Sequence, residues 1–178
     1  MAPPAVPQDV LERAARVRLA VFDVDGVLTD GKLYYSADGV ETKAFHVQDG
    51  SALKMLRASG IEVAIITGRS SPMVARRARE LGIELLIQNA GDKAQALTEL
   101  LATRPALAQL PLEHCCAIGD DLPDIALFER VGLAISVPNG HPAARRRAHC
   151  VTETAGGQGV AREVAELLLR AHDRWNYP

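Results

Sequence analysis

The sequence predicts an α/β fold: a doubly wound, Rossmann-like parallel sheet with helices on both faces. Short apolar runs alternate with helical stretches along most of the chain, which is typical of parallel sheets whose strands are joined by helices. The apolar runs 19–22, 62–66 and 115–118 lead within two residues to carboxylate or hydroxyl side chains. Because ligands bind at the carboxyl ends of strands in such sheets, we expect the functional site at that edge.

Composition excludes several classes of protein. The chain has 178 residues, of which 48% are hydrophobic and 24% charged, which suits one globular domain. A formal net charge of −2 provides no basic field for nucleic acid, and the apolar runs are too short to span a membrane. The N-terminus lacks the pattern of a secretory signal. Three cysteines form no disulfide framework, so we expect a cytoplasmic protein.

Three parts are expected along the chain: an N-terminal extension (1–18), a single domain (19–172) and a tail (173–178). The extension begins with proline-rich residues 1–7, expected to be mobile, and continues as a short helix over 8–16. Asp49 is expected to cap a helix that ends near residue 59, and Pro72 to begin one that ends at Gly82. The other expected helices cover residues 92–103, 123–131, 142–149 and 160–171. The first expected strand begins at residue 19, and the others cover residues 62–66, 84–87, 115–118, 132–137 and 150–151.

A small β-hairpin flap is expected over residues 32–46, because Ala37-Asp38-Gly39 is a turn signal between two β-prone runs. A lone two-stranded hairpin is marginal in water, so it should pack on its own domain or on another copy of the chain. Neither the stretch between Asp25 and Thr67 nor that between Thr67 and Lys93 could hold a folded cap domain. The site should therefore be open in the isolated chain.

Acidic, hydroxyl and lysine side chains occur in a definite order at the ends of the predicted strands and at the start of a helix. Asp23 and Asp25 follow the first apolar run, and two acids at the end of a buried strand are costly unless a cation balances their charge. Thr67 follows the second strand, Lys93 begins a helix, and a second acid pair begins at Asp120. Each has an ordinary explanation alone, as a turn residue, a helix cap or a solvated lysine. The joint order indicates an active site.

This four-part order, over residues 19 to about 137, resembles the haloacid dehalogenase superfamily of phosphatases. The resemblance implies that Asp23 is a nucleophile that forms an aspartyl-phosphate, with Asp25 as general acid and base. It also implies Mg²⁺ held by the side chains of Asp23 and Asp120 and the backbone carbonyl of Asp25. Thr67, the backbone after it and Lys93 would bind the phosphoryl oxygens. The acids expected to support them are Asp121 and Asp124.

Three segments carry a closer resemblance: DVDGVLTDG at 23–31, KAFHVQDG at 43–50 and GGQGVARE at 156–163. They look like the capless 3-deoxy-D-manno-octulosonate 8-phosphate phosphatases, from about residue 17 to 171. This resemblance implies an acidic sugar phosphate substrate, a role in lipopolysaccharide inner-core synthesis and a homotetramer assembled through the hairpins. The substrate carboxylate needs donors such as arginine and lysine. The expected substrate-binding residues are Asp25, His46, Val47, Gln48, Asp49, Gly50, Lys54, Gly68, Arg69, Arg77 and Lys93.

Two positions test this resemblance. Gln48 stands where relatives commonly have a basic residue, and Arg162 follows a glycine-rich segment that reaches an adjacent active site in relatives.

Three alternatives for the function stay open. A nine-carbon acidic sugar phosphate could be the substrate on the same scaffold. A phospho-receiver signalling module also uses acids, threonine and lysine around Mg²⁺, with an early acid pair and a phosphorylated aspartate on a central strand before the threonine. This chain instead has its second acid pair after Lys93. An inactive scaffold is the third.

Overall fold

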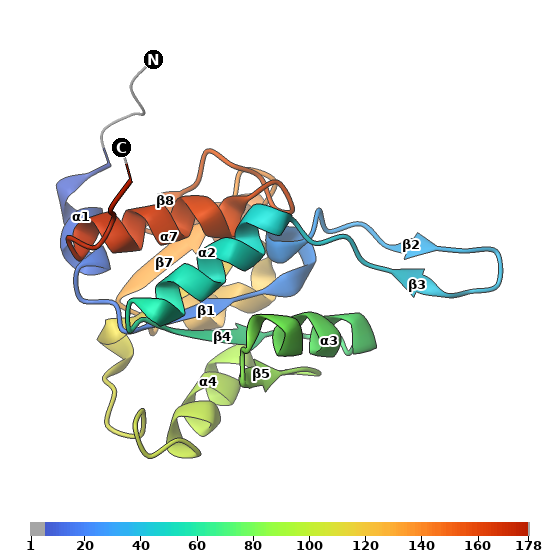
Figure 1. Ribbon diagram of the computed structural model, residues 1–178, viewed down its shortest axis with the longest axis horizontal. Helices are drawn as coiled ribbons and strands as arrows, with labels where there is room; N and C mark the ends of the chain where they lie inside the picture. The colour runs from blue at the N-terminus through green and yellow to red at the C-terminus, as the bar shows by residue number, and fades with distance from the viewer. Residues whose placement is uncertain (1–5, 178) are drawn as a thin grey trace.

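A six-stranded, fully parallel sheet forms the centre of the molecule in the computed structural model, which describes residues 6–177 (Figure 1). The strands lie in the order β5-β4-β1-β6-β7-β8, so the chain winds outward from β1 in both directions. Their bounds are β1 Leu19–Phe22, β4 Glu62–Ile66, β5 Leu85–Ile87, β6 Cys115–Gly119, β7 Leu133–Ser136 and β8 Cys150–Val151. The doubly wound prediction is confirmed. Residues 1–5, part of the proline-rich start, lie outside the described residues.

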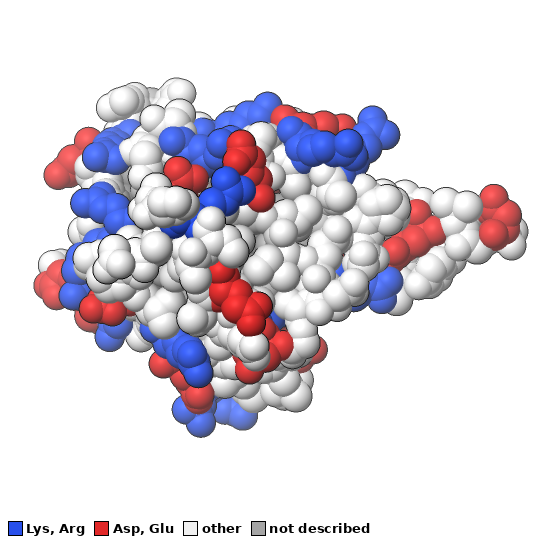
Figure 2. Space-filling model, turned by 90° about the horizontal axis from the view of Figure 1, so that it is seen from below, with Lys and Arg blue, Asp and Glu red and all other residues white. Residues whose placement is uncertain are grey.

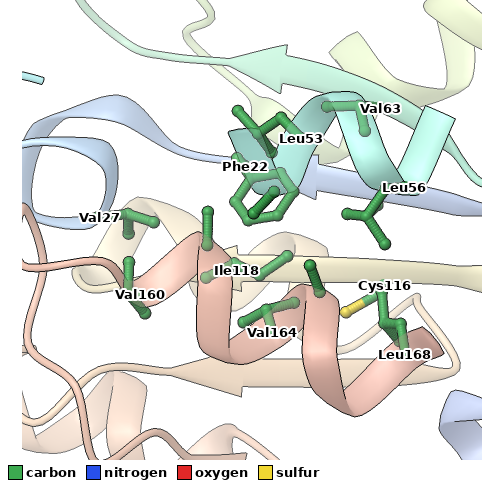
Figure 3. Close-up of a cluster of buried hydrophobic side chains, with 14 of the residues drawn as sticks. Phe22, Val27, Leu53, Leu56, Val63, Cys116, Ile118, Val160, Val164 and Leu168 are labelled. Carbon is green, nitrogen blue, oxygen red and sulfur yellow. The ribbon is translucent and has the colours of Figure 1, made fainter. Parts of the chain in front are cut away.

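Helices cover both faces of the sheet because its strands alternate their side chains between two cores. Phe22 and Ile118 face the core under α1, α2, α3 and α7 (Figure 3). Val21 and Ala117 face the core under α4, α5 and α6. The bounds are α1 Gln8–Ala14, α2 Val47–Ala58, α3 Pro72–Leu81, α4 Lys93–Ala102, α5 Ile125–Phe128, α6 Pro142–Arg147 and α7 Val160–Ala171. In residues 6–177 none of these helices has the length and apolar character needed to cross a membrane.

The predicted hairpin is confirmed, and it projects from the body of the molecule (Figures 1 and 2). Only two residues on each side pair: β2 is Tyr34–Tyr35 and β3 is Glu41–Thr42. Four apolar or aromatic side chains on it are 44–60% exposed, namely Leu33, Tyr34, Tyr35 and Val40. The connections between the strands of the main sheet contain no further domain in the described chain, as the spacing predicted.

The start of α2 differs from the prediction. The helix begins at Val47 with His46 as its N-cap residue, and Asp49 lies inside the first turn. The Asp49 carboxylate instead accepts a hydrogen bond of 3.1 Å from the backbone N–H of Arg162, in the first turn of α7. The first N–H groups of a helix lack partners within it, so Asp49 satisfies a donor of another helix and joins α2 to α7. The other predicted elements agree with the structure to within a few residues at their ends.

Candidate active site

The candidate active site lies where the chain direction across the sheet reverses. β1 has β4 on one side and β6 on the other, and the carboxyl ends of these three strands lead to Asp23, Thr67 and Asp120. Such a reversal leaves a crevice between loops that run to opposite faces, which is where ligands bind in open α/β sheets. The topology therefore gathers residues that are far apart in the sequence.

Lys93 joins two carboxylates at this edge. Its Nζ lies 2.8 Å from Asp23 Oδ1 and 2.6 Å from Asp124 Oδ1. The other oxygen of Asp124 accepts hydrogen bonds of 3.0 Å from the backbone N–H groups of Asp120 and Asp121. Asp23, Lys93 and Asp124 are each at most 8% exposed. A buried ion pair needs such additional hydrogen bonds to offset the cost of removing its charges from water.

The negative charge in this cluster exceeds what one lysine balances. Burial raises the pKa of Asp23 to about 6, although the ammonium of Lys93 opposes the rise. Burial and the neighbouring carboxylates, first Asp23 and then Asp124, raise the pKa of Asp120 to about 7. Burial opposes the ammonium form of Lys93, but the two adjacent carboxylates outweigh it and raise the pKa of Lys93. A further cation near Asp23 and Asp120 would reverse the two carboxyl shifts.

The donor set fits a hard divalent cation such as Mg²⁺. Asp23, Asp120 and Asp124 each offer a carboxylate oxygen within 4.8 Å of the others, and Mg²⁺ prefers oxygen ligands. Both Asp124 oxygens already have protein partners, so Asp23 and Asp120 are the side chains best able to hold the ion. Asp124 then supports the site by orienting Lys93 and the backbone at Asp120. Asp121 is exposed and contributes its backbone N–H.

Close backbone contacts hold the loop that follows β1. Gly26 has a φ of +89°, and a Cβ atom there would collide with the Asp120 carboxylate. The carbonyl of Gly26 accepts a hydrogen bond of 2.9 Å from Asn139 Nδ2, and Asn139 Oδ1 accepts one of 2.7 Å from the N–H of Gly156. Asn139 thus connects the loops after β1 and β7 with the glycine-rich segment. Sequence reasoning missed Asn139, because one asparagine in a Pro-Asn-Gly turn gives no signal beyond the turn itself.

Asp25 points to a different set of partners from Asp23. Lys43, directly after β3, donates a hydrogen bond to Asp25 Oδ1, and Arg69 Nε lies 3.9 Å from Asp25 Oδ2. Glu41 connects the two cations: its Oε1 lies 2.7 Å from Arg69 Nη2 and 3.7 Å from Lys43 Nζ. Lys43 and Glu41 were missed by sequence reasoning. Both lie in the hairpin, where the alternation of side chains indicates a strand but does not indicate which residues elsewhere in the chain the strand contacts.

Thr67 is 2% exposed and its hydroxyl accepts a hydrogen bond of 3.4 Å from the backbone N–H of Arg69. Gly68 is exposed beside it. Arg69 itself has a side chain that is 44% exposed. This loop therefore offers a hydroxyl, backbone donors and a guanidinium within three residues, at the end of the strand next to β1.

The residues predicted at the start of α2 form a second group. Arg77 of α3 donates to the backbone carbonyl of His46 at 3.4 Å, and a side chain at Gly50 would collide with the Arg77 guanidinium. His46 and Asp49 each have a buried polar atom without a hydrogen-bond partner among the described residues. Val47 is 81% exposed, and Gln48 lies exposed beside Gly159.

Two other predicted residues have partners away from the carboxylate cluster. Lys54 is exposed one helical turn beyond Gly50, where it lines a groove with Arg57 and Arg79. Arg162 has its side chain against the sulfur of Met55, 3.2 Å away, while its backbone N–H is bound by Asp49. The structure places neither side chain in contact with Asp23, Asp25 or Lys93.

A parallel sheet with a buried Asp23–Lys93 pair and further acids at its switch point is the arrangement expected for the haloacid dehalogenase superfamily of phosphatases. The family model described as haloacid dehalogenase-like hydrolase matches residues 83–164. The chain is 46% identical to the 3-deoxy-D-manno-octulosonate 8-phosphate phosphatase of Yersinia pestis over 169 residues, which are 95% of this chain and 88% of that protein. The chain belongs to the 3-deoxy-D-manno-octulosonate 8-phosphate phosphatase family.

Solved structures of relatives have the same fold. The crystal structure of the Yersinia pestis phosphatase has a TM-score of 0.90 over 95% of this chain and 89% of that chain, at 46% identity. The phosphatase of Moraxella catarrhalis, crystallised with a magnesium ion, a phosphate ion and a KDO molecule, has a TM-score of 0.89 at 46% identity. That match covers 94% of both chains. The predicted family and capless fold are confirmed.

Proposed function

We propose that this protein is a Mg²⁺-dependent phosphatase that hydrolyses 3-deoxy-D-manno-octulosonate 8-phosphate to the free sugar acid and phosphate. The observation that carries the proposal is the buried Asp23–Lys93 pair, 2.8 Å apart, beside Asp120 at the switch point of the sheet. Family membership supports the choice of substrate, because relatives at 44–46% identity are named for this activity. The reaction would provide the sugar acid for the inner core of lipopolysaccharide.

In the first step Asp23 attacks the phosphorus atom in line with the bond to the sugar oxygen. That bond breaks as the Asp23–phosphorus bond forms, and Asp25 donates a proton to the departing oxygen. Lys93 orients Asp23 and places a positive charge beside the phosphoryl oxygens. Thr67 and the backbone N–H groups after it supply hydrogen-bond donors to the same oxygens.

In the second step Asp25 accepts a proton from water as that water attacks the phosphorus of the aspartyl-phosphate. Phosphate leaves and Asp23 is regenerated as a carboxylate. Mg²⁺, held by the side chains of Asp23 and Asp120 and the backbone carbonyl of Asp25, would offset the repulsion between a carboxylate and a phosphate dianion. Asp124 keeps Lys93 in place through its 2.6 Å contact, and Asp121 supports the same turn through its backbone.

Recognition of the sugar acid falls to the residues around the hairpin base and the start of α2. Arg69 and Arg77 suit a carboxylate because a guanidinium can donate two parallel hydrogen bonds. The segment from His46 to Gly50 lies beside Arg77 and would contact the sugar through its backbone and polar side chains. The side chains of Lys54 and Arg162 would contact the sugar acid only after moving from their present positions, or at the active site of a neighbouring subunit.

The assembly proposed is a homotetramer formed through the hairpins. The hairpin projects from the body of the molecule (Figure 2). It has two residue pairs and four exposed apolar or aromatic side chains, and a hairpin this small gains little stability alone. Burial of these side chains between copies would stabilise it. A cytoplasmic location is part of the proposal and is supported by the free thiols of Cys115, Cys116 and Cys150.

Phosphate release from a panel of sugar phosphates tests the function. We expect kcat/KM to be highest for the eight-carbon acid 8-phosphate, lower for a nine-carbon acid 9-phosphate and lowest for glucose 6-phosphate. EDTA should abolish the activity and Mg²⁺ restore it. Asp23→Asn should remove turnover of every substrate, with Asp38→Asn on the exposed hairpin turn as a matched control. A preference for the nine-carbon substrate would reassign the substrate, and full activity of Asp23→Asn would refute the mechanism.

A further inference from the structure

Lys43 has a side chain that is only 2% exposed although it lies on the projecting hairpin. By contrast Lys32, at the other base of the hairpin, is 73% exposed. Removing an ammonium group from water is costly unless a carboxylate compensates. The compensating groups here are Asp25, which accepts a hydrogen bond from Lys43 Nζ, and Glu41, whose Oε1 lies 3.7 Å away.

The two aspartates of the loop after β1 therefore have separate cations. Lys93, on α4, holds Asp23 at 2.8 Å, and Lys43, on the hairpin, holds Asp25. Oδ1 of Asp25 accepts the hydrogen bond from Lys43, whereas within residues 6–177 no hydrogen bond is donated to Oδ2, which has a long ion-pair contact of 3.9 Å with Arg69 Nε. One oxygen of Asp25 is thus fixed and the other is left for a further partner.

We propose that Lys43 is a positioning residue for Asp25, an inference that rests on the proposed function. By binding Oδ1 it directs Oδ2 toward the oxygen of the departing sugar, so that the proton passes along one defined path. Glu41 supports this arrangement because it contacts both Lys43 and Arg69. The hairpin then contributes to proton transfer as well as to assembly, through a residue that touches neither the phosphoryl group nor Mg²⁺ in this scheme.

Two substrates with different leaving groups distinguish this positioning role of Lys43 from a purely structural one. A sugar alkoxide is a poor leaving group that needs a proton, whereas p-nitrophenolate leaves without one, so only the first depends on Asp25 as an acid. Because kcat/KM reports steps up to formation of the aspartyl-phosphate, it excludes the later use of Asp25 as a base. Lys43→Met should lower kcat/KM on the sugar phosphate about 100-fold and on p-nitrophenyl phosphate by less than about 3-fold.

The experiment compares Lys43→Met, Lys43→Arg and the exposed control Lys32→Met on both substrates, with melting temperatures to verify folding. Lys43→Arg should recover part of the lost activity, and Lys32→Met should resemble the wild type. Equal losses on both substrates, or none, would overturn the role of Lys43. If Lys43→Met does not fold, Glu41→Gln must show the same selective loss at smaller size. A wild type that releases phosphate from neither substrate would instead refute the proposed function.

Discussion

The carboxylate cluster (Asp23, Asp120, Asp124 and Lys93) and the hairpin base (Glu41 and Lys43) contact different aspartates of the loop after β1, and they differ in what holds them in place. Asp23, Lys93 and Asp124 are fixed by a buried sheet edge, two short ion-pair contacts and backbone hydrogen bonds. Lys43 and Glu41 are placed by a hairpin with two residue pairs and an exposed apolar surface. In the proposed mechanism, phosphoryl transfer therefore depends on residues of the buried core, while proton delivery and sugar recognition depend on a small hairpin with few contacts of its own.

Lys93→Met should have the largest effect, because Lys93 contacts the two buried carboxylates of Asp23 and Asp124, at 2.8 and 2.6 Å. We expect turnover to fall at least about 1,000-fold through loss of electrostatic stabilisation at the phosphoryl group. Loss of one partner of a buried ion pair should also cost about 3–5 kcal/mol in the free energy of unfolding. Steady-state kinetics and urea denaturation measure the two effects. A variant with near-normal stability would contradict a stabilising role for the Lys93 ion pairs in the folded protein.

Mg²⁺ should stabilise the folded protein more at high pH than at low pH. The pKa values of Asp23 and Asp120, about 6 and about 7, are raised above those of the unfolded chain. The folded metal-free protein therefore holds more protons, and its stability falls as the pH rises through these values. Mg²⁺ needs the ionised carboxylates. At about 100 times its dissociation constant it should raise the melting temperature by about 5–10 °C at pH 8, and by much less at pH 5.5.

Asp120→Asn provides the control for this pH dependence. The variant lacks one charge of the cluster, so its metal-free form should lose less stability as the pH rises, and Mg²⁺ should give a smaller increase in melting temperature. Scanning calorimetry at the two pH values, with Mg²⁺ or EDTA, measures both. A Mg²⁺ effect of the same size in wild type and variant would place the ion elsewhere.

Leu33→Asp and Val40→Asp should affect assembly through the hairpin and leave the stability of the core unchanged. Both side chains are about half exposed in the single chain, so a charge there should change the free energy of unfolding by less than about 0.5 kcal/mol where no partner covers them. If copies associate through the hairpins, each variant should lower the mass in solution measured by light scattering. Gln109→Asp, on an exposed loop at the end of α4, is the matched control. Unchanged mass in both hairpin variants would contradict the assembly.

Gln48→Arg should have the smallest effect and act on recognition alone. It introduces a basic side chain at an exposed position beside Gly159. A new charge-assisted hydrogen bond to the sugar carboxylate should lower KM by about 3- to 10-fold and leave kcat unchanged. The same substitution should leave KM for p-nitrophenyl phosphate, which has no carboxylate, at its wild-type value. A change in kcat would show that Gln48 takes part in more than binding.

The sequence was informative wherever a property depends on residues close together in the chain. Apolar runs separated by helical periods predicted the sheet and its helices, and Ala37-Asp38-Gly39 predicted the hairpin turn. The order of acids, threonine and lysine predicted one group; the structure brings Asp23, Lys93 and Asp120 together and places Thr67 after the strand next to β1. Asp49 shows where this reasoning stops: an acid near a helix start looks like that helix's own cap, whereas its partner is Arg162, 113 residues away in the sequence.

What the sequence by itself determined was the set of strands and the chemistry at their ends, because side-chain alternation and turn preference are local. Only the tertiary structure decided that Asp23 and Asp25, two residues apart, have different cations as partners. That choice depends on how the hairpin lies against the loop after β1, and on the burial of Lys43 there. Burial and pairing of charges arise from long-range packing, and no local pattern in the chain encodes them.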